Sequence, residues 1–174
     1  MKYLSYISTP IVLLGRKNAR IITKKINHSD LYTGKNLNDK IWTLEHVVPQ
    51  SRVSNDGKKN DLHNLAGIES KLNSSKGNKK FGDCMYDYKL YEECKLSKKL
   101  FEPHFGKGDV ARICAYMLET YGDSIDEDNL IDKETLLRWN YENPPCDKEK
   151  RKNELIYEVQ GNYNRFIDDH NFIV

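Results

Sequence analysis

The chain has 174 residues, of which 31% are charged, and its formal net charge at pH 7 is only +2. So small a net charge excludes a polycation that coats nucleic acid through charge alone. The longest uninterrupted apolar run, residues 11–14, is too short to span a bilayer, so we expect no membrane insertion. The length suits one globular domain over residues 1–174, which we expect to be a monomer.

The N-terminal residues do not have the pattern of a secretory signal. Polar residues and a proline interrupt their apolar run, and no small-residue cleavage site follows. We therefore expect the protein to stay where it is made. The four cysteines contain no Cys-x-x-Cys pair, which argues against a zinc knuckle and a dense disulfide scaffold. The spacing of Cys84 and Cys94 is compatible with a disulfide but cannot establish one.

The first half of the chain predicts a helix followed by a strand, a loop, a second strand and a second helix. Isoleucines at helical spacing indicate a helix over residues 18–28, and a polar loop follows to residue 40. Residues 41–48 are rich in β-forming types and indicate a strand that Pro49 ends. Residues 54–60 are typical of a loop. A second strand is predicted around residues 63–66, and a helix over residues 68–76 that ends at Gly77.

The second half is predicted to be mainly helical. Apolar residues from Val110 to Tyr121 recur every three or four positions, which indicates an amphipathic helix over residues 109–121. Asp132 is predicted to cap a helix that extends to residue 141. Asp147 is predicted to cap another helix, which ends near Gly161.

The chemistry is concentrated at the end of the first predicted strand. Glu45 and His46 are adjacent there, and Asn73 follows on the predicted helix. Carboxylate and amide oxygens are ligands that Mg²⁺ and Ca²⁺ prefer. A neutral imidazole can accept a proton from water near pH 7. A Glu-His pair alone is more often an ordinary surface pair, but its spacing from Asn64 and Asn73 favours a one-metal site that cuts phosphodiesters. His63 is interpreted as structural.

A basic region surrounds this candidate site. Between residues 52 and 80 the chain has three carboxylates and more than twice as many basic side chains: Arg52, Lys58, Lys59, Lys71, Lys76, Lys79 and Lys80. Such a run is usually a solvated loop. Beside a candidate metal site it favours phosphate contact, because a polyanionic substrate has to be held there.

Three segments carry a resemblance to a known family: Glu45–Ser51, Asp61–Leu65 and Asn73–Asn78, the last followed by Phe81-Gly82. They resemble the endonuclease I family, a branch of the HNH or ββα-metal (His-Me finger) nucleases. The likeness continues in residues 107–112, 136–140 and 151–168. It implies an α+β fold with a ββα-metal core at about residues 41–78, embedded in a single nuclease domain whose helical remainder spans about residues 105–170.

The resemblance also implies an activity and a set of roles. The activity is a largely sequence-nonspecific endonuclease that cuts DNA, and often RNA, to 5′-phosphate and 3′-hydroxyl ends with one Mg²⁺ ion, or with Ca²⁺ or Mn²⁺. Glu45 and Asn73 would be metal ligands, His46 the general base, and Asn64 the brace of the loop that presents His46. The candidates for phosphate contact, which the sequence does not rank, are Arg52, Lys76 and Arg112.

The chain also departs from the family pattern. It has Ala66 and Lys76 where arginines are common, and lysine offers phosphate a point charge in place of a planar fork. Many relatives are exported and disulfide-bonded, whereas this chain shows no export signal, so we expect an intracellular protein. A virus-encoded origin is compatible with this expectation, and secretion stays an alternative.

Two alternative functions remain open. One is a restriction-type or homing-type HNH enzyme with sequence or structure specificity, for which no separate DNA-reading motif is visible. The other is a noncatalytic nucleic-acid-binding or zinc-bound module. Its zinc ligands would be His46, His63, Cys84 and Cys94, which lack the usual short spacings.

Overall fold

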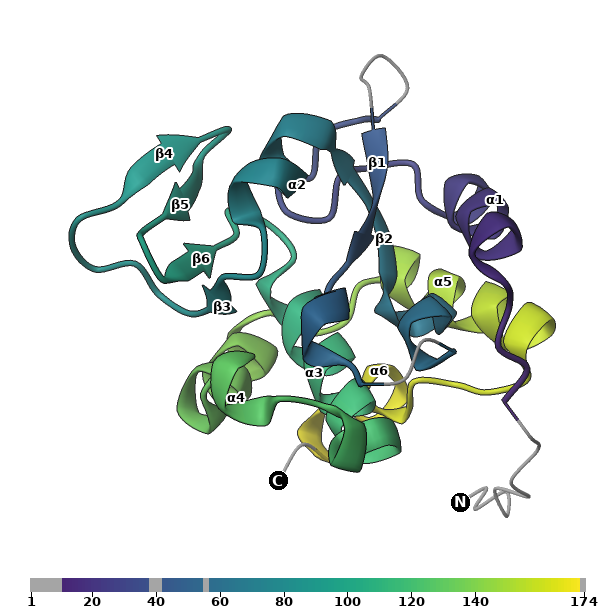
Figure 1. The fold of residues 1–174 in the computed structure, drawn as a ribbon. Coiled ribbons are helices and arrows are strands. Elements are labelled where there is room, and N and C mark those ends of the chain that lie inside the picture. The colour runs from purple at the N-terminus through teal and green to yellow at the C-terminus, as the bar shows by residue number, and fades with distance from the viewer. Residues whose placement is uncertain (1–10, 38–41, 55–56, 173–174) are drawn as a thin grey trace.

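The computed structural model describes residues 11–37, 42–54 and 57–172, and it has the predicted α+β fold (Figure 1). Its helices and strands follow in this order: α1 (Arg16–Ile26), β1 (Trp42–His46), β2 (Leu65–Glu69), α2 (Ser70–Lys76), β3 (Lys80–Phe81), β4 (Lys89–Tyr91), β5 (Cys94–Leu96), β6 (Leu100–Glu102), α3 (Lys107–Tyr121), α4 (Lys133–Glu142), α5 (Asp147–Gln160) and α6 (Arg165–Asp168). The expectation about an N-terminal signal, the start of the predicted 41–48 strand and part of the 54–60 loop lie outside the described residues.

β1, β2 and α2 form the predicted strand, loop, strand and helix. The two strands pair antiparallel, with Glu45 opposite Ala66 and His46 opposite Leu65. β2 begins later than predicted, because residues 62–64 form a short 3₁₀ helix. α2 follows β2 directly and ends at Gly77, whose φ of 54° is a conformation that favours glycine.

Asp61 fixes the segment between β1 and β2 to the helices. The side chain is fully buried. Its carboxylate accepts hydrogen bonds from the backbone N–H of His63 (2.8 Å) and the side-chain amide of Gln160 (2.9 Å). It also accepts hydrogen bonds from the hydroxyls of Tyr116 (2.7 Å) and Tyr121 (2.8 Å). Burial and the charge of Asp61 raise the pKa of both tyrosines, so they remain protonated donors.

The helical second half is confirmed. α3 begins two residues before the predicted start, and its apolar side packs in the larger hydrophobic core with α4. Asp132 caps α4, since its side chain accepts a hydrogen bond from the backbone N–H of Thr135 (2.8 Å). The predicted cap of α5 is wrong by one residue: Cys146 is the N-cap, and Asp147 lies in the first turn, where the helix dipole also favours an acidic residue. Within the described chain, no helix is long and apolar enough to cross a membrane.

A four-stranded sheet, in the order β3-β6-β5-β4, was not predicted. β3 and β6 are parallel and the other pairs are antiparallel. Each strand has only two or three residues, too few to produce a recognisable alternation. In Figure 1 this sheet lies at one side of the molecule, beside α2.

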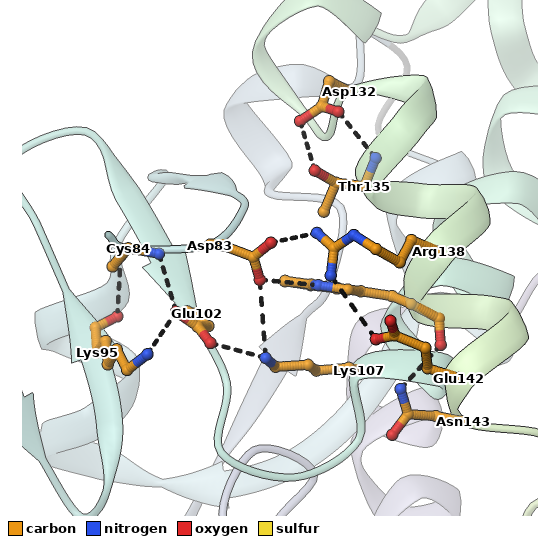
Figure 2. A network of polar contacts seen from close by, with 11 residues as sticks. Asp83, Cys84, Lys95, Glu102, Lys107, Asp132, Thr135, Arg138, Glu142 and Asn143 are labelled. Carbon is orange, nitrogen blue, oxygen red and sulfur yellow. Dashed lines mark hydrogen bonds and ion pairs between the residues drawn. The ribbon is translucent and has the colours of Figure 1, made fainter. Parts of the chain in front are cut away.

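Polar contacts attach this sheet to α3 and α4 (Figure 2). Asp83, which follows β3, accepts a hydrogen bond from the indole N–H of Trp139 (3.1 Å) and forms an ion pair with Arg138. Glu102 at the end of β6 accepts a hydrogen bond from Lys107 Nζ (2.7 Å). The position of the sheet is therefore fixed by both helices.

The cysteines that could have formed a disulfide are both free. Each is buried, and each thiol contacts a different backbone carbonyl: Cys84 Sγ that of Lys95 (3.6 Å) and Cys94 Sγ that of Tyr32 (3.4 Å). Burial raises the pKa of Cys94 to about 11, so its thiol stays protonated. These cysteines therefore pack as small core residues, and the considered disulfide is wrong.

Candidate active site

Glu45 lies near the end of β1 and is almost fully buried, with 3% of its surface exposed. Its Oε1 accepts a hydrogen bond from the hydroxyl of Tyr32 (2.7 Å) and lies 2.8 Å from Nζ of Lys76. Burial, followed by the charge of Glu45, raises the pKa of Tyr32 well above its ordinary value. Tyr32 therefore acts as a permanent donor that orients the carboxylate. Tyr32 lies outside every motif, so sequence reasoning missed it.

His46 is the next residue of the strand and is 7% exposed. Burial, followed by the positive charges of Arg16, Lys76 and Lys59, lowers its pKa from 6.5 to about 4. The imidazole is therefore neutral near pH 7. Its Nδ1 lies 3.2 Å from the side-chain amide nitrogen of Gln50, so this amide donates to Nδ1 and the ring proton is on Nε2.

Asn64 clamps the backbone that follows His46. The side chain is fully buried. Its Oδ1 accepts a hydrogen bond from Val48 N–H (2.8 Å), and its Nδ2 donates to the Val48 carbonyl (3.2 Å). The Asn64 backbone carbonyl also accepts a hydrogen bond from Val47 N–H (3.0 Å). This geometry is the one expected of a brace for the segment that presents His46.

Replacing Asn64 with alanine is expected to lower the free energy of unfolding by about 1–3 kcal/mol, because both polar groups of buried Val48 lose their partner. Urea denaturation measures this change. Asn78→Ala, at an exposed position, is the control and should leave stability nearly unchanged. Equal stabilities of the two variants would contradict the clamp.

Asn73 lies on α2 beside β1. Its Nδ2 donates to the backbone carbonyl of Leu44 (3.3 Å), the residue before Glu45. No donor among the described residues contacts its Oδ1, so this oxygen is available to a ligand. In the part of the chain that the structure describes, no group of three or more His, Cys, Asp or Glu side chains could hold a metal. The zinc-bound alternative therefore has no ligand cluster among these residues.

Lys76, a predicted phosphate contact, lies inside the protein. The side chain is fully buried, and its Nζ contacts Glu45 and lies 4.8 Å from the ring centroid of Phe81. Its charge is therefore directed at the candidate metal ligand, not at solvent. A phosphate could reach this ammonium only after the pair with Glu45 had opened.

Arg112, another predicted phosphate contact, is not part of the site. Only 1% of its surface is exposed, and its guanidinium donates to both carboxylate oxygens of Glu149 (2.8 and 2.6 Å). It also donates to Oδ1 of Asn140 (3.0 Å). The expectation that Arg112 contacts phosphate is corrected by this geometry, because the hydrogen-bonding capacity of the side chain is used inside the core.

Arg52 remains near the surface, close to the site. It lies in the short 3₁₀ helix after β1, forms an ion pair with Asp126 and donates to the Asn78 carbonyl (3.3 Å). Sequence reasoning missed Arg16, an exposed residue at the start of α1 whose charge reaches His46. No motif connects α1 with the end of β1, so only the fold could identify Arg16.

Comparisons with known proteins find similar sequences over most of the chain. The profile of the family described as Endonuclease I matches residues 8–171. The extracellular ribonuclease of Bacillus amyloliquefaciens is 35% identical over 73% of this chain and 50% of that protein. The extracellular ribonuclease of Bacillus subtilis (strain 168) is 32% identical over 91% of this chain and 58% of that protein. The periplasmic deoxyribonuclease of Aeromonas hydrophila is 26% identical over 71% of this chain and 62% of that protein.

The chain thus spans about half to three fifths of the length of these three relatives. Their names place them outside the cytoplasm. They give no support to the expectation of an intracellular protein.

Proposed function

Because the chain belongs to the endonuclease I family, we propose that it is a metal-dependent endonuclease that hydrolyses the phosphodiester bonds of DNA and RNA with little regard to sequence. The observation that carries the proposal is the buried His46 directly after Glu45 at the end of β1, with the following backbone clamped by Asn64.

In this proposal His46 is the general base. Hydrolysis requires removal of a proton from the attacking water, and an unprotonated ring nitrogen can take it. Nδ1 is the unprotonated nitrogen, so the Gln50 amide has to give way to the water there. Asn64 holds the backbone after His46, which keeps the imidazole in one orientation relative to the substrate.

Glu45 and Asn73 would hold the metal ion. Their carboxylate and amide oxygens are the donor types that Mg²⁺, Ca²⁺ and Mn²⁺ accept. Asn73 donates to the carbonyl of Leu44, the residue before Glu45, and this contact holds Asn73 beside the strand that carries Glu45. When bound, such an ion stabilises negative charge on the phosphate and on the departing oxygen.

Lys76 would compete with that ion for Glu45. Lys76→Met should lower the melting temperature without metal, because it leaves a buried carboxylate unpaired at a cost of about 3–5 kcal/mol. The rise in melting temperature on adding Mg²⁺ should be larger than in the wild type, since the competing ammonium is gone. Thermal melts in EDTA and across Mg²⁺ concentrations measure both effects.

The control for this substitution is Lys71→Met, at an exposed position of the same helix. It should respond to Mg²⁺ as the wild type does. An equal Mg²⁺ response of Lys76→Met and Lys71→Met would refute the competition.

In this proposal the phosphate is contacted by basic side chains outside the core, not by the buried Lys76 and Arg112. The positive charges of Arg16 and Lys59 act on His46 and lower its pKa. Arg52 lies in the short 3₁₀ helix that follows β1. Arg112 is removed from this role by its pair with Glu149.

The substrate range is tested by digesting end-labelled DNA and RNA of several unrelated sequences with Mg²⁺ and mapping the products. We expect a continuous ladder with 5′-phosphate and 3′-hydroxyl ends on both substrates, since the relatives include proteins named as ribonucleases and as deoxyribonucleases. Discrete bands at one sequence would instead support the restriction-type or homing-type alternative. By analogy with the extracellular and periplasmic relatives, we propose action outside the cytoplasm.

A further inference from the structure

An open groove of about 800 Å³ lies between the segment after β1 and the four-stranded sheet. Its lining includes five cations and one carboxylate: Arg52, Lys79, Lys80, Lys98, Lys99 and Asp87. We propose that this groove binds a single-stranded stretch of the polynucleotide, with lysines on the phosphates and Tyr86 stacked on a base. The inference rests on the proposed nuclease function and names the form of substrate that the site receives.

Four of the five cations of the groove form no ion pair with a described residue, whereas Arg52 pairs with Asp126. Lys79 and Lys80 donate to backbone carbonyls, those of Ser75 and Asp128, each at 3.0 Å. Lys98 and Lys99 are exposed and form no ion pair with any described residue. A row of cations without carboxylate partners attracts a chain of phosphates and releases the counterions of that chain on binding.

Tyr86 distinguishes single strands from duplexes. It lines the groove and is 82% exposed, so the faces of its ring are accessible to a ligand. A ring presented in this way can stack on a base whose face is free, and bases in a single strand have free faces. Bases inside a duplex are already stacked on each other, so a duplex would gain little from the ring.

The loop that carries Tyr86 is held in place before any ligand arrives (Figure 2). Asp83 is tied to Trp139 (3.1 Å) and to Arg138 on α4. The backbone N–H of Cys84 donates to Glu102 (2.8 Å) on β6. Tyr86 follows two residues later, so little ordering of the loop is required when the ring stacks on a base.

The groove begins beside the candidate active site. Arg52 lies six residues after His46, so their Cα atoms are at most about 22 Å apart. Its guanidinium donates to the Asn78 carbonyl, two residues beyond the end of the helix that carries Asn73. A nucleic-acid strand bound along the lysines would therefore continue toward His46 and the proposed metal ligands.

Binding can be measured without cleavage, on the full chain in EDTA, by the fluorescence anisotropy of labelled 15-mers. The probes are oligo-dT, oligo-U and a DNA hairpin duplex. Tyr86→Ala should weaken binding of both single strands about 5- to 150-fold and leave duplex binding nearly unchanged. The matched control is Tyr141→Ala on α4, since Tyr141 is 80% exposed and lies outside the groove.

The lysines are tested through salt dependence. Lys98→Gln combined with Lys99→Gln should reduce the slope of log affinity against log salt by about 1.4 for single strands, if each lysine neutralises one phosphate. Lys148→Gln combined with Lys150→Gln, two exposed residues of α5, removes the same charge elsewhere and should leave the slope largely unchanged.

Three results would overturn the inference: no binding by the wild type, equal binding by Tyr86→Ala and Tyr141→Ala, or an equal loss for duplex and single strands. A preference between oligo-dT and oligo-U would reflect the sugar or the methyl group of thymine, and it leaves the groove assignment intact. A protein that shows the expected binding pattern but does not cut with Mg²⁺ would refute the nuclease proposal alone.

Discussion

Replacing His46 with alanine is expected to slow phosphodiester cleavage by about 10²- to 10⁴-fold, the range for loss of a general base. Nucleic-acid binding in EDTA should persist, because the imidazole acts in the chemical step. Single-turnover cleavage with Mg²⁺ gives the rate. The control is His104→Ala, a histidine with a half-exposed side chain on the surface, which should cut at the wild-type rate. Cleavage by His46→Ala at the rate of His104→Ala would refute the assigned role.

The pH dependence follows from the same residue. Only the neutral imidazole acts as a base, and the pKa of His46 is lowered from 6.5 to about 4. The fraction in the neutral form is therefore nearly constant between pH 8 and 6 and falls only as the pH approaches 4. We expect no loss of kcat/KM near pH 6.5 that depends on His46. A half-maximal rate at pH 6.5 in the wild type would contradict the effect of burial.

Replacing Arg112 with alanine is expected to lower the free energy of unfolding by about 3–5 kcal/mol, because it leaves the buried carboxylate of Glu149 without its partner. Urea denaturation measures this loss. Arg151→Ala is the control on α5: its pair with Glu154 is exposed, and its loss should leave the free energy of unfolding nearly unchanged. A stable Arg112→Ala variant with a raised KM would instead restore the phosphate role.

A double substitution separates a broken pair from lost packing. Burial raises the pKa of Glu149 to about 7, against the lowering effect of the hydrogen bonds from Arg112, so the pair carries a large desolvation penalty. Arg112→Met combined with Glu149→Leu removes both charges and keeps apolar volume. It should therefore be clearly more stable than Arg112→Ala.

The elements that the sequence predicted correctly are those with a strong local signal. The amphipathic α3, the cap of α4 by Asp132 and the end of α2 at Gly77 depend on neighbouring residues, and the structure confirms all three. The short sheet β3–β6 has no such signal, because its strands are held by long-range pairing and by contacts with α3 and α4.

In the candidate site, too, local sequence predicted some features and only the fold determines the others. Adjacency in sequence places Glu45 beside His46, and the antiparallel pairing of β1 with β2 brings Asn64 to Val48. The sequence could not predict which basic side chains point into the protein, since a lysine in a basic run is normally solvated. Only the fold buries Lys76 against Glu45, pairs Arg112 with Glu149 and brings Arg16 toward His46.

The nicking of supercoiled plasmid by the purified protein tests the central proposal most directly. With Mg²⁺, the wild type should convert supercoiled DNA to open-circular and then linear DNA, and EDTA should abolish the conversion. Supercoiled plasmid that remains intact with Mg²⁺, Mn²⁺ and Ca²⁺ would contradict a metal-dependent endonuclease at Glu45, His46 and Asn73.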